Sequence, residues 1–90
     1  MVGKRVLVTG ATGGIGHAIA MYLAKQGAII GIHHNRPYND VKHLIQDIQQ
    51  LSPSSVPLMA DLRKWSDSQQ LVHRFVAEVG SIDGLSLIHI

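Results

Sequence analysis

Short apolar runs alternate along the chain with segments whose apolar residues recur at helical spacing. Each apolar run is bounded by glycine, proline or polar residues and has the length of a buried strand. The segments expected to form strands are residues 5–9, 28–33 and 56–60, and a fourth strand is expected to begin near Ile82. Because strands that alternate with helices predict a parallel sheet covered by helices, we expect an α/β fold.

Three segments carry the helical spacing. The first spans 14–26 and is ended by Gly27, the second is capped by Asn39 or Asp40, and the third begins at a capping box over 66–69. The apolar stripes expected to face the sheet are Ile15, Ala18, Ile19, Tyr22 and Leu23, then Val41, Leu44, Ile45, Ile48 and Leu51, then Leu71, Val72, Phe75, Val76 and Val79. Right-handed crossovers would place the first strand centrally, which predicts the strand order 3-2-1-4.

A glycine-rich turn joins the first strand to the first helix, and it reads Val6-Leu-Val-Thr-Gly-Ala-Thr-Gly-Gly-Ile-Gly16. Glycine at Gly10 permits a sharp turn, Gly14 permits backbone contact with a pyrophosphate, and Gly16 lets the helix pack close to the strand. The helix that begins there directs unpaired N–H groups and the positive end of its dipole toward an anion. The turn therefore predicts a phosphate-binding site.

The motifs over residues 2 to about 85 resemble the short-chain dehydrogenase/reductase family. Thr9-Gly10-x-x-x-Gly14-x-Gly16 resembles its nucleotide-binding fingerprint, and two further signatures follow in the family's order, Asp61-Leu62 and Gly80-Ser-Ile-Asp-Gly-Leu85. The resemblance implies the N-terminal half of a Rossmann-type doubly wound parallel sheet, with the element order βαβαβαβ.

The resemblance also implies which residues contact a nicotinamide dinucleotide. Asp61 and the backbone of Leu62 would contact the adenine, while Thr12 and Ile15 would lie along the pyrophosphate. The family implies a parent enzyme, a homo-oligomer, that transfers hydride between NAD(P) and a small carbonyl or alcohol substrate.

The catalytic Ser, Tyr and Lys of the family have no counterparts in this chain, so no catalytic residue is assigned and the chain alone is expected to be inactive. Tyr38-Asn-Asp-Val-Lys42 matches the letters of the family's Tyr-x-x-x-Lys pair. It follows the second strand, on the adenosine side, too far from a nicotinamide ring for acid–base work.

The residues after the second strand predict the choice of cofactor. An acidic residue there would accept hydrogen bonds from the ribose of NAD, whereas a cation suits the 2′-phosphate of NADP. The chain has His33-His34-Asn35-Arg36 at this place and no carboxylate, and His34, Asn35 and Arg36 are expected to contact the cofactor. The run resembles the His-x-x-Arg of NADP-preferring members, although many of these carry a basic residue where Gly13 stands. We expect NADP, with NAD as the alternative.

Two other functions stay open. Thr9-Gly10-x-x-Gly13-x-x-Gly16 also resembles the extended relatives that act as sugar-nucleotide epimerases and dehydratases, and Asp61-Leu62-Arg63 suits them too. Phe75-x-x-Glu78-x-Gly80-Ser-Ile-Asp83-Gly-Leu85 favours the shorter reductases. The alternative of a different class is a Rossmann module that binds the dinucleotide without catalysis, as a sensor or scaffold.

Composition narrows the partners. The chain has 90 residues, a net charge of +2 and scattered basic residues, which lack the Lys/Arg stripe of a nucleic-acid binder. It has no cysteine, and its 6 histidines follow no metal-binding spacing; His33 and His34 are adjacent on a strand, so their side chains tend to opposite faces. With no signal peptide and no apolar run of roughly 18 residues, we expect a cytoplasmic protein with no membrane contact and no bound metal.

The length and the C-terminus suggest a division of the chain. A complete enzyme of the family needs a domain of roughly 200 to 250 residues, so we expect residues 1–85 to be part of a nucleotide-binding domain. The family would continue from there into an Asn-Ala-Gly motif, whereas this chain ends in Ser86-Leu-Ile-His-Ile90. Residues 86–90 are expected to be a truncated strand or a non-native tail that resembles a translated sequencing adapter.

Overall fold

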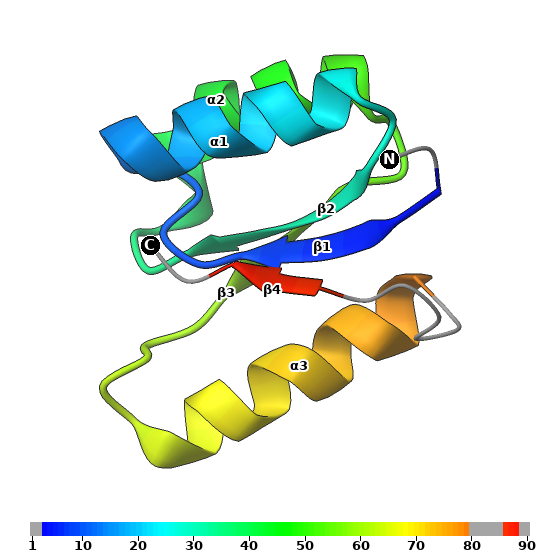
Figure 1. Cartoon of the computed structure of the whole chain (residues 1–90). Helices are drawn as coiled ribbons and strands as arrows, with labels where there is room; N and C mark the ends of the chain where they lie inside the picture. The colour runs from blue at the N-terminus through cyan, green and yellow to red at the C-terminus, as the bar shows by residue number, and fades with distance from the viewer. Residues whose placement is uncertain (1–2, 80–85, 89–90) are drawn as a thin grey trace.

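A parallel sheet with helices on both faces forms the fold (Figure 1). The computed structural model describes residues 3–79 and 86–88. Its strands are β1 (Arg5–Val8), β2 (Ile29–His34), β3 (Val56–Met59) and β4 (Ser86–Ile88), and its helices are α1 (Gly14–Lys25), α2 (Tyr38–Leu51) and α3 (Trp65–Val79). The strands lie in the order β3-β2-β1-β4, and each neighbouring pair is parallel. The predicted α/β class is confirmed, and this order is the one expected from right-handed crossovers.

The two faces of the sheet bury alternate residues of the strands. Figure 1 shows α1 and α2 over one face and α3 over the other. Val6 and Val8 of β1 point into the core under α1 and α2, whereas Leu7 between them packs with Phe75 of α3. Because β1 lies between β2 and β4 and under helices on both faces, its carboxyl end has a fixed position, and the glycine turn begins there.

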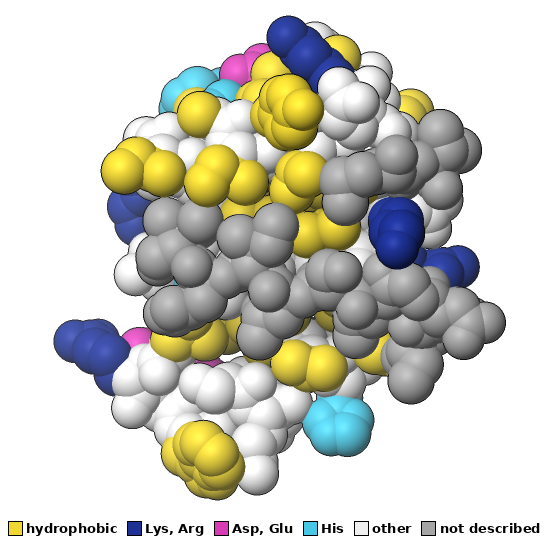
Figure 2. All heavy atoms as spheres, viewed as in Figure 1, with side chains coloured by type: hydrophobic (Ala, Val, Ile, Leu, Met, Phe, Trp, Pro, Cys, Tyr) yellow, Lys and Arg dark blue, Asp and Glu magenta, His cyan; other side chains and the backbone are white. Residues whose placement is uncertain are grey.

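The buried stripe predicted for α1 is wrong at three of its five residues, since Leu23 is buried and Ile19 packs against the core as predicted. Ile15 and Tyr22 are 72% and 63% exposed, and Ala18 is also exposed. The residues of α1 that the structure buries are Gly16, Ala20, Leu23 and Ala24. Small residues on this face let the helix axis approach the sheet, so the larger apolar side chains are left outside. Figure 2 shows hydrophobic side chains gathered on the outer surface of this part of the molecule.

The other two helices bury most of their predicted stripes. In α2 the residues Val41, Ile45 and Ile48 are buried, while Leu44 is half-buried and Leu51 is 39% exposed. In α3 the residues Leu71 and Phe75 are buried, Val76 is half-buried and Val72 is 39% exposed. A helix that packs against a sheet on one side buries a narrower stripe than the full apolar pattern suggests.

The predicted helix starts are corrected by about one turn or less. α2 begins at Tyr38, after Pro37, and has no side-chain cap, so Asn39 and Asp40 lie inside the helix. α3 begins at Trp65, one residue before the predicted capping box. Its first turn is tied to the preceding loop instead, because the carboxylate of Asp67 accepts a hydrogen bond from the backbone N–H of Asp61 at 3.1 Å.

Most ends of the first three strands differ from the predicted bounds by one residue. β2 runs to His34, and β4 pairs with β1 through Val6 and Ser86. The predicted start of the fourth strand at Ile82 and the motif over 80–85 lie outside the described residues. The division of the chain at residue 85 stays a prediction.

Candidate functional site

The turn between β1 and α1 presents backbone N–H groups in one direction. Gly10 has a φ of 64°, a left-handed conformation that favours glycine. The N–H of Gly13 donates to the carbonyl of Gly10 at 3.0 Å, which closes the turn. Among residues 3–79 and 86–88 the N–H groups of Gly14, Ile15 and Gly16 have no acceptor, and Gly13 supplies no side-chain cap. The N-terminus of α1 therefore offers these donors to an anion.

The glycines of the turn have different surroundings. A Cβ at Gly14 would meet nothing within 4 Å, so the space above this residue is open. A Cβ at Gly16 would collide with the carbonyl oxygen of Gly10, which is the close helix-to-strand packing that the sequence predicts. Thr12 is buried at 7% exposure, while the side chain of Ile15 points away from the core. An open Gly14 beside unpaired donors fits a pyrophosphate.

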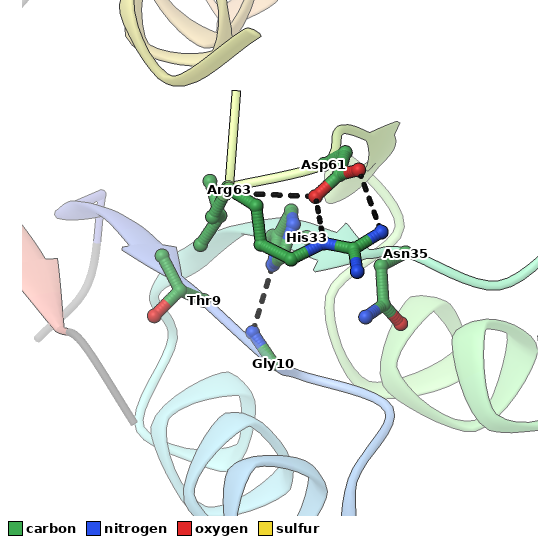
Figure 3. Close-up of a pocket in the computed structure, with 7 residues that line it drawn as sticks. Thr9, Gly10, His33, Asn35, Asp61 and Arg63 are labelled. Atoms are coloured by element: carbon green, nitrogen blue, oxygen red, sulfur yellow. Dashed lines mark hydrogen bonds and ion pairs between the residues drawn. The ribbon is translucent and has the colours of Figure 1, made fainter. Parts of the chain in front are cut away.

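A pocket of about 350 Å³ opens beside this turn, where β1, β2 and β3 end (Figure 3). It is lined by Thr9, Gly10, His33, Asn35, Asp61, Leu62 and Arg63. The structure thus brings together Gly10, Asn35, Asp61 and Leu62 of the predicted site residues. The others, which are Thr12, Gly14, Ile15, Gly16, His34 and Arg36, are not part of the lining. Thr9, His33 and Arg63 also line the pocket, although none of them is among the predicted cofactor-binding residues.

His33 joins two of the strand ends. Its ring is buried, with 4% of the residue exposed. Its Nδ1 lies 2.9 Å from the backbone nitrogen of Gly10, and its Nε2 lies 2.9 Å from the carbonyl oxygen of Ala60. A backbone N–H can only donate and a carbonyl can only accept. The ring is therefore neutral, with its proton on Nε2 and a bare Nδ1.

Asp61 and Arg63 form a bidentate salt bridge at the pocket rim (Figure 3). Arg63 donates from Nε to Oδ1 and from Nη2 to Oδ2 of Asp61, each at 3.0 Å, and its backbone N–H also donates to Oδ1. These hydrogen bonds, the one from the Arg63 side chain first, lower the pKa of Asp61 to about 2. The carboxylate is therefore ionised at neutral pH and can accept a further hydrogen bond.

The loop after β2 holds its own shape. His34 is buried, and its Nδ1 donates to the carbonyl of Arg36 at 2.7 Å. The ring of His34 also meets the ring of Tyr38 edge-on, with centroids 6.5 Å apart. Asn35 faces the pocket, while Arg36 is exposed outside its lining. His34, predicted as a binding side chain, therefore supports the loop that carries Arg36.

Other candidate chemistry stands apart from the pocket. Tyr38 and Lys42 lie in the first turns of α2, and neither lines the pocket. Within the described part of the chain, no three His, Cys, Asp or Glu side chains gather in a way that could hold a metal ion. In the same part, every helix is too short or too polar to cross a bilayer.

Three comparisons with known proteins agree. A family profile described as short chain dehydrogenase matches residues 4–87. The short-chain dehydrogenase/reductase homolog YusS of Bacillus subtilis is 34% identical over 83 residues, which are 92% of this chain and 76% of YusS. A dehydrogenase/reductase from Sinorhizobium meliloti superposes with a TM-score of 0.87 at 28% identity, over 100% of this chain and 35% of its own.

A further solved structure carries a bound nucleotide. The NADH-dependent reductase A1-R′ complexed with NAD superposes with a TM-score of 0.79 at 34% identity. The match covers 98% of this chain and 36% of that one. This chain spans about a third of the length of both solved structures.

Proposed function

The chain belongs to the short-chain dehydrogenase family, and from this premise we propose that it is the N-terminal, NAD(P)-binding portion of an oxidoreductase. The parent would transfer hydride between the nicotinamide and a carbonyl or alcohol substrate. The observation that carries the proposal is the row of unpaired N–H groups at the start of α1, directly beside a pocket formed by the ends of three strands.

Each part of the site suits one part of a dinucleotide. The N–H groups of Gly14, Ile15 and Gly16 would hold the pyrophosphate, and the open space at Gly14 admits its oxygens. Thr12 and Ile15 would flank it. At the other end, the ionised Asp61 would accept a hydrogen bond from the adenine amino group, beside the backbone of Leu62. The bound nicotinamide supplies the hydride, while the protein supplies position.

We propose NADP as the preferred cofactor. Residues 33–36, which span the end of β2 and the two residues after it, contain no carboxylate to bind a free ribose 2′-OH. Arg36 is exposed at the adenosine side, and the hydrogen bond from His34 to its carbonyl fixes the backbone that carries it. A planar guanidinium is suited to a phosphate. NAD is the alternative, as the nucleotide named for reductase A1-R′ illustrates.

Catalysis would need residues beyond this chain. We propose that the chain has no activity alone, that residues 1–85 are the nucleotide-binding part of a longer domain, and that residues 86–90 are a truncated or non-native end. The family likeness also leads us to propose a homo-oligomeric parent that works in the cytoplasm.

The deciding experiment is recovery of the coding sequence downstream of residue 85. The complete protein and the 90-residue chain would then be compared by size exclusion, thermal melting and NADPH oxidation with a panel of carbonyl compounds. We expect a downstream Ser and Tyr-x-x-x-Lys, turnover by the complete protein, and none by the 90-residue chain. We also expect that chain to aggregate or unfold partly, because β4 would lie at an uncovered sheet edge.

Other outcomes would change the assignment. Dinucleotide binding without the downstream catalytic residues would favour a non-catalytic module, and turnover of a sugar nucleotide would favour an epimerase or dehydratase. Turnover by the 90-residue chain that Tyr38→Phe removes would overturn the proposal that catalysis lies elsewhere.

A further inference from the structure

His33 is a buried residue of the pocket lining, and its side chain contacts the backbone at the ends of two other strands, at Gly10 and at Ala60. We propose that His33 is a positioning residue that ties the phosphate-binding turn to the adenosine end of the pocket, and that it does so as a neutral ring protonated on Nε2. The inference rests on the proposed dinucleotide binding.

The ring and the backbone of His33 both hold the glycine turn. Nδ1 accepts the N–H of Gly10, and the carbonyl of His33 accepts the N–H of Ala11 at 3.0 Å. These two contacts consume the first N–H groups of the turn, so they are not offered to a phosphate. They fix the direction in which the next donors, at the start of α1, are presented.

The other edge of the ring holds the segment that carries Asp61. Nε2 donates to the carbonyl of Ala60, and the N–H of Ala60 donates to the carbonyl of His34 at 3.1 Å. Asp61 follows Ala60 directly and lines the pocket. One imidazole therefore stands between the group that would hold the pyrophosphate and the group that would hold the adenine.

Histidine is suited to this bridge because it has an acceptor and a donor on opposite edges of one rigid ring. Asparagine and glutamine carry both functions at one end of the side chain, and phenylalanine carries neither. Because the site is buried, loss of either partner leaves a backbone group without a hydrogen bond. The bridge thus depends on the residue type and not only on its volume.

The charge state of the ring matters for the same reason. A proton on Nδ1 would place two N–H groups face to face at Gly10 and displace the turn. The charged residues of the pocket lining are Asp61 and Arg63, which pair with each other, and the carboxylate of Asp67 accepts the N–H of Asp61. Thr9, Gly10 and Asn35 also line the pocket and carry no charge. On β2, the residue next to His33 is His34, whose ring is hydrogen-bonded to the carbonyl of Arg36.

The first test uses the complete protein without ligand. Nitrogen NMR of the His33 ring at neutral pH should show a proton on Nε2 and a bare Nδ1, and the amide signal of Gly10 should move in His33→Asn. A ring protonated on Nδ1, or on both nitrogens, at neutral pH would overturn the inference. This reading needs no bound nucleotide and no turnover.

The second test measures NADP affinity by calorimetry. His33→Phe should weaken binding by about tenfold or more, and His33→Asn by less, because its Oδ1 can still accept the N–H of Gly10. His73→Phe, an exposed histidine on α3, is the matched control and should bind as the wild type does. Equal affinity of His33→Phe and wild type would overturn the inference. If His33→Phe does not fold, His33→Asn and the NMR reading decide.

A further reading separates positioning from general stability. Asp61→Asn should weaken NADP binding in the wild type and add little in His33→Phe, because the bridge that places Asp61 is already lost. If the losses of NADP affinity in Asp61→Asn and His33→Phe multiply in the double variant, the two residues act independently and the inferred coupling is overturned. A wild type that binds no dinucleotide would overturn the proposed function, and the coupling with it, while the ring tautomer is still read separately.

Discussion

The two ends of the candidate site are built from different material. The turn after β1 presents the backbone N–H groups of Gly14, Ile15 and Gly16, and glycines shape it. The end beside β2 and β3 offers side chains, namely an imidazole, an amide and an Asp61–Arg63 pair. At the first end, the absence of side chains on the glycines exposes the backbone. At the second end, the side chains themselves provide the polar groups. Substitutions should therefore act through shape at one end and through charge at the other.

The largest expected effect is at the turn, where Gly16→Ala should destabilise the fold. The added Cβ would strike the carbonyl of Gly10, which is backbone and cannot swing away. Overpacking of this kind costs about 3 kcal/mol in severe cases. Thermal melting of the complete protein would measure it, with Gly14→Ala as the control, since a Cβ there meets nothing within 4 Å. Equal melting temperatures for both variants would contradict the close packing.

Gly14→Val should separate binding from folding. The valine would fill the open space proposed for the pyrophosphate, so dinucleotide binding should be abolished, a loss of about a hundredfold or more, or about 2.7 kcal/mol. Circular dichroism should stay that of the wild type, and the change in cofactor fluorescence on binding should disappear. A folded Gly14→Val protein that binds NADP normally would move the phosphate to another place.

At the side-chain end, Arg36→Asp should weaken NADP binding, because it removes the cation proposed to pair with the 2′-phosphate and adds a repelling carboxylate. A charge-assisted contact contributes about 1.5 to 3 kcal/mol, or roughly tenfold to a hundredfold in affinity. Titrations with NADP and NAD should show the loss for NADP alone. Lys42→Asp on α2 makes the same charge change nearby and should lose little. Equal losses of NADP affinity in both variants would show that the effect comes from the overall surface charge and not from a contact with Arg36.

The smallest expected effect concerns the charge of Asp61. Hydrogen bonds from Arg63 lower its pKa to about 2 from an ordinary 3.8, so the stability it contributes is fully present above about pH 4 and is lost as the pH falls toward 2. Arg63→Ala should raise the pKa of Asp61 toward 3.8, as followed by NMR of the carboxyl carbon. Lys64→Ala, which removes only a weaker charge effect, should shift it less. Because the pair is exposed, melting temperatures should change little.

The sequence predicted the parts of the molecule that depend on local pattern. The order of strands and helices and the turn at Gly10 follow from apolar periodicity and glycine spacing, and the structure contains them. The buried face of α1 was predicted correctly at Leu23 and wrongly at Ile15, Ala18 and Tyr22, because apolarity was equated with burial. Close approach to the sheet selects Gly16, Ala20 and Ala24 instead of Ile15 and Tyr22.

The candidate site was predicted in part, for a related reason. Its motif residues Gly10, Asp61 and Leu62 are recognised by their neighbours in the sequence. His33 was considered only as part of the His-x-x-Arg run and as a metal ligand, and its bridging role was missed because its partners lie 23 and 27 residues away in the chain. The one available signal was a polar residue at the end of an otherwise apolar strand, which by itself names no partner.

The fork that Arg63 makes on Asp61 also has a consequence for the entropy of binding. Both carboxylate oxygens accept hydrogen bonds from Arg63, and its backbone N–H adds a third contact, so these bonds favour one rotamer of Asp61. An adenine that binds there would lose less free energy to the ordering of the Asp61 side chain. Arg63 would thus improve affinity without touching the ligand, by restricting the side chain of the residue proposed to contact the adenine.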